Sequence, residues 1–131
     1  MLDLKGLHHV AIICSDLERS KRFYTEVLGF NILGEHFRKE KNSYKVDLQL
    51  KNTCLLELFT FPSPPPRLTR PEATGLRHIA FSVTDIHKEH NKLIDNKIGV
   101  EEIRTDEYTG KKFFFFKDPD GLPIELYENI T

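Results

Sequence analysis

The sequence predicts an α+β fold of two tandem modules, each with the order strand, helix, strand, strand, strand (βαβββ). Three observations lead to this prediction. The two halves of the 131-residue chain resemble each other, each half contains alternating strand patterns, and a proline-rich segment joins the halves. With 39% hydrophobic and 30% charged residues, the composition is that of an ordinary globular protein.

The internal similarity is clearest at the beginning and the end of each half. Residues 7–17 (LHHVAIICSDL) resemble residues 76–86 (LRHIAFSVTDI), and residues 56–59 (LELF) resemble residues 124–127 (IELY). Because both matches keep the same residue types in the same order, a duplication explains them better than chance does. Two copies are too few for a solenoid, so we expect two modules that close on each other.

The first module is predicted over about residues 5–61. Residues 7–14 are apolar and rich in β-branched side chains, which is typical of a strand. The segment Ser15-Asp16-Leu17-Glu18 is a capping-box signature, and it begins a helix that Gly29 should end. Strands are expected over 30–38, 44–50 and 53–61, of which 44–50 alternates apolar and polar residues.

The second module repeats this order over about residues 76–128. A strand is expected over 76–83, Thr84-Asp85 begins a helix that Gly99 should end, and strands follow over 100–105, 112–116 and 122–127. The sequence DPDG at 118–121 is a strong turn signal between the last two strands. Residues 62–75 hold five of the seven prolines and form the predicted linker, so residues 1–131 are expected to make one domain.

Two histidines and two glutamates occupy matching positions in the two modules. His9 and His78 are each followed two residues later by a small alanine on the same strand face, which leaves room beside the imidazole. Glu57 and Glu125 lie in apolar runs, where an unpaired carboxylate would cost several kcal/mol. A bound cation removes that cost, although a Lys or Arg partner would also do so. Two imidazoles and two carboxylates suit a divalent Ni, Co, Zn, Mn or Fe ion.

The charge balance excludes some classes of partner. The formal net charge of −1 leaves no basic face for nucleic acid, and no apolar run approaches the roughly 20 residues that span a bilayer. The N-terminal segment lacks a signal-peptide pattern, so a cytoplasmic protein with a small-molecule substrate is expected. Two cysteines are too few for a disulfide scaffold.

Taken together, these motifs resemble the vicinal oxygen chelate superfamily, which includes glyoxalase I, bleomycin resistance proteins and extradiol dioxygenases. The resemblance covers nearly the whole chain. It rests on His9, SDLERS at 15–20, FY at 23–24, LGF at 28–30, Glu57, His78, and DPDG at 118–121 before Glu125. It implies that the paired modules curl into a half-barrel sheet around a metal ion held by His9, Glu57, His78 and Glu125. It also implies a homodimer, with ligands from one chain or from both.

The chain looks most similar to small bacterial members of the glyoxalase I type. This implies a metal-dependent lyase or isomerase that acts on a small carbonyl compound through a metal-bound enediolate, with Glu125 or Glu57 as general base. In lactoylglutathione lyase an Arg and an Asn contact glutathione, each four residues after a ligand. Ile13 and Phe61 stand there in this chain, so the glutathione site is not matched.

Two other functions stay open. One is an Fe(II) extradiol-type dioxygenase, although such members of the superfamily generally lack a ligand at the position of Glu57. The other is a non-catalytic protein that binds a small molecule and confers resistance to it.

Overall fold

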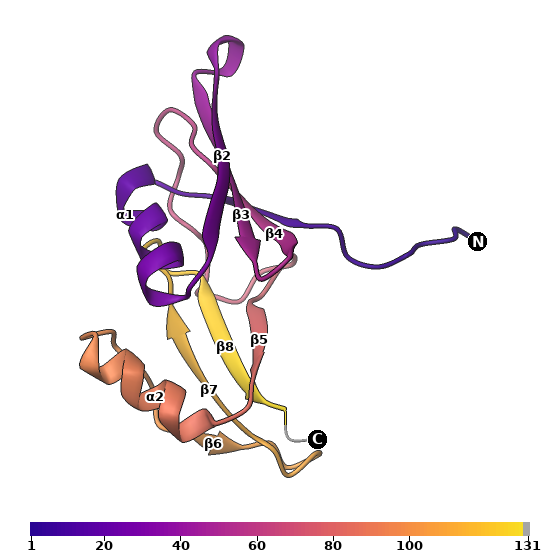
Figure 1. The fold of residues 1–131 in the computed structure, drawn as a ribbon, viewed down its shortest axis with the longest axis vertical. Coiled ribbons are helices and arrows are strands. Elements are labelled where there is room, and N and C mark those ends of the chain that lie inside the picture. The colour runs from indigo at the N-terminus through magenta and orange to yellow at the C-terminus, as the bar shows by residue number, and fades with distance from the viewer. Residues whose placement is uncertain (130–131) are drawn as a thin grey trace. The chain divides into compact units, whose positions relative to one another are not determined.

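The computed structural model describes residues 1–129, with the backbone but not the side chain of Cys54. The chain divides into two compact units between Pro65 and Pro66, which is within the predicted linker. Each unit contains one four-stranded sheet and one main helix (Figure 1). The predicted α+β class with two tandem βαβββ modules is confirmed. Within residues 1–129, no helix is long and apolar enough to cross a membrane.

Unit 1 begins with the short strand β1 (Val10–Ile13) and the helix α1 (Leu17–Arg22), which continues as a π-helical turn (Phe23–Val27). The strands β2 (Asn31–Arg38), β3 (Ser43–Leu50) and β4 (Thr53–Phe59) follow, with a 3₁₀ turn (Lys39–Lys41) between β2 and β3. The strand order is β1-β4-β3-β2, in which β1 pairs parallel with β4 and the other pairs are antiparallel. After α1 the chain therefore continues into β2, which is the edge strand opposite β1.

Unit 2 repeats this topology. It consists of β5 (Ile79–Val83), α2 (Ile86–Asp95), β6 (Arg104–Thr105), β7 (Lys112–Lys117) and β8 (Pro123–Glu128). Its strand order is β5-β8-β7-β6, and β5 pairs parallel with β8. Within each module, the first strand therefore lies next to the last strand and runs parallel to it.

Some predicted boundaries are wrong. The predicted strand over 100–105 is reduced to Arg104–Thr105, with one isolated bridge between Val100 and Phe116. The Glu101 carboxylate accepts a hydrogen bond from the Phe115 backbone N–H at 2.8 Å, so a side chain replaces part of the strand ladder here. The first strand of each module begins one residue after its histidine, because ladder pairing starts at Val10 and Ile79.

An aspartate caps each helix. The Asp16 carboxylate accepts a hydrogen bond from the Arg19 N–H, and the Asp85 carboxylate accepts one from the Lys88 N–H, both at 3.1 Å. The cap of α1 is therefore Asp16 and not Ser15, one residue beyond the position that the capping-box signature predicts. The predicted end at Gly99 is also wrong, since α2 ends at Asp95 and the left-handed residue beyond it is Lys97, with φ 60°.

Replacing Asp85 with alanine is expected to lower the free energy of unfolding by about 1 kcal/mol, because an orphan N–H at the helix start loses its acceptor. Urea denaturation followed by circular dichroism measures this loss. The matched control is Asp95→Ala at the other end of α2, where removal of a negative charge from the helix C-terminus should not destabilise the fold. Equal losses in both variants would contradict the cap assignment.

The buried core of each unit determines which face of its sheet carries the glutamate. In unit 1, Val46 and Leu48 on β3 are fully buried and pair across the strands with buried Leu58 and Leu56. In unit 2, Phe114 is fully buried and its ring contacts His90 of α2 at 4.7 Å. Successive strand residues point to opposite faces, so the residues between these core positions face away from the helix. Among them are the two glutamates.

Candidate metal centre

His9 and Glu57 come together in unit 1. The parallel pairing of β1 with β4 sets Ala11 opposite Glu57, and His9 precedes that alanine by two residues on the same face. The His9 Nε2 lies 3.4 Å from a Glu57 carboxylate oxygen. The Glu57 side chain is 13% exposed and that of His9 is 38% exposed, so a largely buried carboxylate meets a more open imidazole.

His78 and Glu125 form the equivalent pair in unit 2. Ala80 of β5 lies opposite Glu125 of β8, which is the same register as in unit 1. The His78 Nε2 lies 3.8 Å from a Glu125 carboxylate oxygen, and the exposed fractions of these side chains are 27% and 14%. The equal registers explain why the two halves of the sequence carry these residues at matching positions.

Each unit thus brings one imidazole nitrogen together with one carboxylate. Within residues 1–129, no group of three or more His, Cys, Asp or Glu side chains is close enough to hold a metal ion. The donor types fit a divalent transition metal, and their spacing leaves room for an ion between imidazole and carboxylate. One pair alone offers two ligands, which is fewer than a divalent transition metal takes in proteins.

Glu57 also has a cationic neighbour. The Lys45 ammonium lies 3.7 Å from a Glu57 oxygen and 3.3 Å from an oxygen of Asp47, the residue opposite Glu57 in the ladder. The alternative of a lysine partner for the carboxylate is therefore present in unit 1. The alternation over 44–50 sets Lys45 and Asp47 on one face of the strand, but it does not by itself indicate that Lys45 contacts Glu57.

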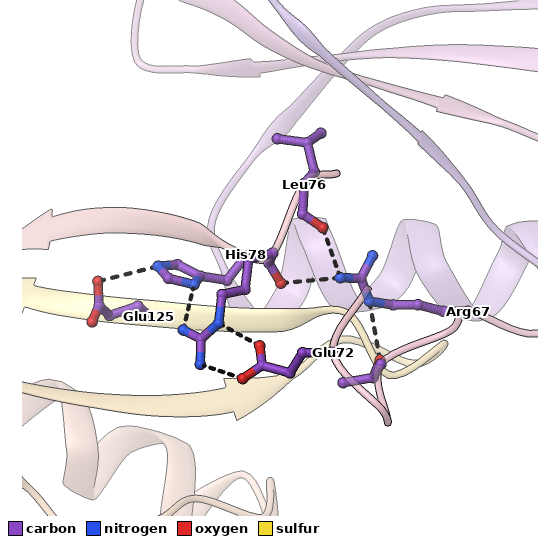
Figure 2. A network of polar contacts seen from close by, with 7 residues as sticks. Arg67, Glu72, Leu76, His78 and Glu125 are labelled. Atoms are coloured by element: carbon purple, nitrogen blue, oxygen red, sulfur yellow. Dashed lines mark hydrogen bonds and ion pairs between the residues drawn. The ribbon is translucent and has the colours of Figure 1, made fainter. Parts of the chain in front are cut away.

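Unit 2 holds its histidine differently. Figure 2 shows that Arg67 of the linker reaches the backbone just before His78, where its guanidinium donates hydrogen bonds to the carbonyls of Leu76 and Arg77, each at 3.0 Å. The Arg77 side chain is itself tied to the Glu72 carboxylate and lies 3.5 Å from the His78 Nδ1. These contacts fasten the linker to the entrance of β5 and so position the imidazole.

The surroundings of Glu125 are apolar on one side. Phe115 lies opposite it on β7, and the His78 and Phe115 rings meet edge to face at 4.9 Å. Burial raises the pKa of the Glu125 carboxyl, and nearby His78 and Arg104 oppose this shift to a smaller extent. A carboxylate in such surroundings accepts a proton more readily than an ordinary glutamate does.

Phe59 of β4 and Tyr127 of β8 share a strand face with the glutamate of their own unit. The Arg38 guanidinium lies over the Phe59 ring at 4.7 Å, and the Phe59 and Phe61 rings are stacked. In unit 2 the Tyr127 hydroxyl donates to Asp106 at 2.9 Å, and its ring stacks on Phe113.

A cleft of about 1040 Å³ opens in unit 2. His78 and Glu125 lie in its wall together with Phe113, Phe115 and Arg104. The volume is that of a small-molecule site. Residues of the predicted linker, among them Arg67, Arg70 and Glu72, also line the cleft.

Comparisons with known proteins identify the family of this chain. The model of the Glyoxalase/Bleomycin resistance protein/Dioxygenase superfamily matches residues 6–126. Protein YwkD of Bacillus subtilis is 56% identical over 125 residues, which cover 95% of this chain and 98% of YwkD. The crystal structure of a glyoxalase family protein from Enterococcus faecalis is 48% identical, with a TM-score of 0.88 and coverage of 95% of this chain and 98% of that one.

A more distant structure is the trypanothione-dependent glyoxalase I of Leishmania major, at 30% identity and a TM-score of 0.75, covering 95% of this chain and 87% of that one. The family match spans almost the whole chain, and the similarity at 48% and 56% identity is also nearly full-length. The chain belongs to the glyoxalase/bleomycin resistance protein/dioxygenase superfamily.

Proposed function

We propose that residues 1–131 act as a single domain of a divalent-metal-dependent enzyme of the glyoxalase I type, a lyase or isomerase for a small carbonyl compound. The observation that supports this most is the duplicated His/Glu pair at equivalent strand registers. His9, Glu57, His78 and Glu125 would together hold one Ni, Co, Zn, Mn or Fe ion. The two pairs would come from one chain or from the two chains of a homodimer.

When bound, the ion would act as a Lewis acid that polarises the substrate carbonyl. Glu125 is the proposed general base, which takes the proton from the carbon beside the carbonyl and returns it to the neighbouring carbon. Among residues 1–129, Glu125 forms an ion pair with His78 alone, whereas Glu57 also pairs with Lys45. Burial raises the pKa of the Glu125 carboxyl, which favours Glu125 as the proton acceptor.

The substrate is proposed to be small and not a glutathione adduct. Ile13, on the same strand face as His9, is 55% exposed, and Phe61 is stacked on Phe59. Apolar side chains therefore occupy the two positions at which lactoylglutathione lyase is expected to contact glutathione. The Leishmania major relative is named for trypanothione, so a thiol-carrying substrate is the alternative that an assay must test.

The test is elemental analysis of the full chain, purified without a histidine tag and without chelators. We expect about one divalent transition-metal ion per chain, because ligand sets of this type bind such ions tightly. His78→Ala is expected to lose most of this metal. His87→Ala, on the exposed side of α2, removes an imidazole outside the site and should retain it. Wild-type protein without bound or bindable metal would contradict the proposal.

Activity assays then separate the alternatives. Methylglyoxal should be tested with and without glutathione, and turnover without the thiol is the expected result. Oxygen uptake on a catechol by the iron-loaded protein would favour an extradiol dioxygenase instead. Tight binding of a carbonyl compound without any product on long incubation would favour a non-catalytic binding protein.

A further inference from the structure

The cleft of unit 2 contains more positive charge than the proposed metal centre uses. Its walls carry five cationic side chains, and most of them already have partners. These five are Arg67, Arg70, Arg77, Arg104 and Lys117. Arg67 donates to two backbone carbonyls, Arg77 pairs with Glu72, and Arg104 pairs with Glu101 at 2.9 Å.

Two cations remain. Within the part of the chain that the structure describes, the side chains of Arg70 and Lys117 make no hydrogen bond and no ion pair, although both line the cleft. The Arg70 charge contributes only a minor part of the lowering of the Glu72 pKa, which Arg77 dominates. The acidic residues of the same cleft are Glu72, Glu101, Asp120 and Glu125, of which the first two are already paired with arginines. Arg70 and Lys117 are therefore available to a ligand with a negative charge.

The position of Lys117 relates this charge to the metal ligands. Phe113, Phe115 and Lys117 share one face of β7, and the ladder sets Phe115 opposite Glu125 and Lys117 opposite Pro123. Lys117 is thus about 7 Å along the strand from the level of Glu125, since two residues span that length. An anionic group held by Lys117 would lie a few bonds from a group held at His78 and Glu125.

Arg104 lies on the other side of the Glu125 level from Lys117. Its guanidinium is over the Phe113 ring at 4.8 Å and over the Phe115 ring at 5.6 Å, and the ladder sets Arg104 opposite Phe113. Lys117 therefore provides positive charge at the end of the cleft that Arg104 does not reach through these contacts.

We propose that the unit 2 cleft binds a small organic anion through Arg70 and Lys117, so that the substrate is a carbonyl compound with a carboxylate or phosphate group. The carbonyl end of this inference rests on the proposed function. Binding of the anionic group does not depend on the proposed function, because Arg70 and Lys117 are outside the proposed metal centre and can bind a negative charge without a metal.

The test titrates the metal-depleted full chain with malonate and, separately, with inorganic phosphate, by isothermal calorimetry at low ionic strength. The variant Arg70→Gln/Lys117→Met is expected to bind the preferred anion at least about tenfold more weakly, since charge-assisted hydrogen bonds are lost. The matched control, Arg19→Gln/Lys88→Met, removes the same charges from exposed helix positions outside the cleft and should bind as the wild type does. Thermal melting checks that both variants are folded.

Each outcome decides one point. Tighter binding of malonate indicates a carboxylate substrate, and tighter binding of phosphate indicates a phosphorylated one. Binding of neither anion, equal binding by the cleft variant and the wild type, or equal weakening in the control overturns the inference. The metal content of the cleft variant is measured in parallel, because loss of anion binding with normal metal content concerns this inference alone. A wild-type chain that binds no metal contradicts the proposed function, but the anion titration still tests this inference because it is made on the metal-depleted chain.

Discussion

Replacing Glu125 with glutamine is expected to lower turnover by about 10²–10⁴-fold, the usual contribution of a general base. Glutamine keeps the size and shape of the side chain, which is 14% exposed, but it cannot accept the substrate proton. It also removes one of the two carboxylates proposed to hold the metal, so metal affinity should fall as well. The measurements are kcat/KM on the carbonyl compound that the wild type converts, and metal titration by calorimetry.

The comparison variant separates the two glutamates. Glu57→Gln should weaken metal binding but retain more turnover than Glu125→Gln if the metal is supplied in excess, because only Glu125 is proposed to accept the substrate proton. Glu102→Gln, an exposed position outside the cleft, serves as the control for charge removal. Full turnover by Glu125→Gln would show that the base is assigned to the wrong residue.

Replacing Phe114 with alanine is expected to lower the free energy of unfolding by about 3–5 kcal/mol, because a large cavity would open in the core of unit 2. The Phe114 side chain is fully buried, pairs across the strands with Leu126, and contacts His90 of α2. Single domains are stable by only about 5–15 kcal/mol, so this is a large share of the total. Urea denaturation followed by circular dichroism measures it.

The same variant tests which face of β7 belongs to the core. Phe114 points away from the face of Phe115, so the folded fraction should bind metal as the wild type does. Tyr108→Ala removes an aromatic ring that is 89% exposed and should change stability by no more than about 0.5 kcal/mol. A Phe114→Ala protein that unfolds at the wild-type denaturant concentration would contradict the assigned core.

Most of the fold could be predicted because its signals are local and occur twice. The alternation over 44–50 predicts that Val46 and Leu48 are buried while Asp47 faces away, and the structure agrees. The prediction for residues 100–105 was wrong because Glu101 satisfies the Phe115 N–H with its side chain, a contact that no periodicity in the sequence encodes.

For the candidate site, the sequence by itself determined which residues recur in both halves and share a strand face with a small alanine or lie in an apolar run. The parallel register of β1 with β4 and of β5 with β8 then brings His9 to Glu57 and His78 to Glu125. The joint metal site that combines the pairs stays a prediction.

Only the tertiary structure decided which charged groups surround each pair. Lys45 reaches Glu57 because β3 and β4 are neighbours in a particular register, and Arg67 reaches the Leu76 and Arg77 carbonyls because the linker folds back to the residues just before β5. Such contacts depend on strand register and on the path of a loop. These are set by packing of the whole unit and not by the residues on either side of each charge.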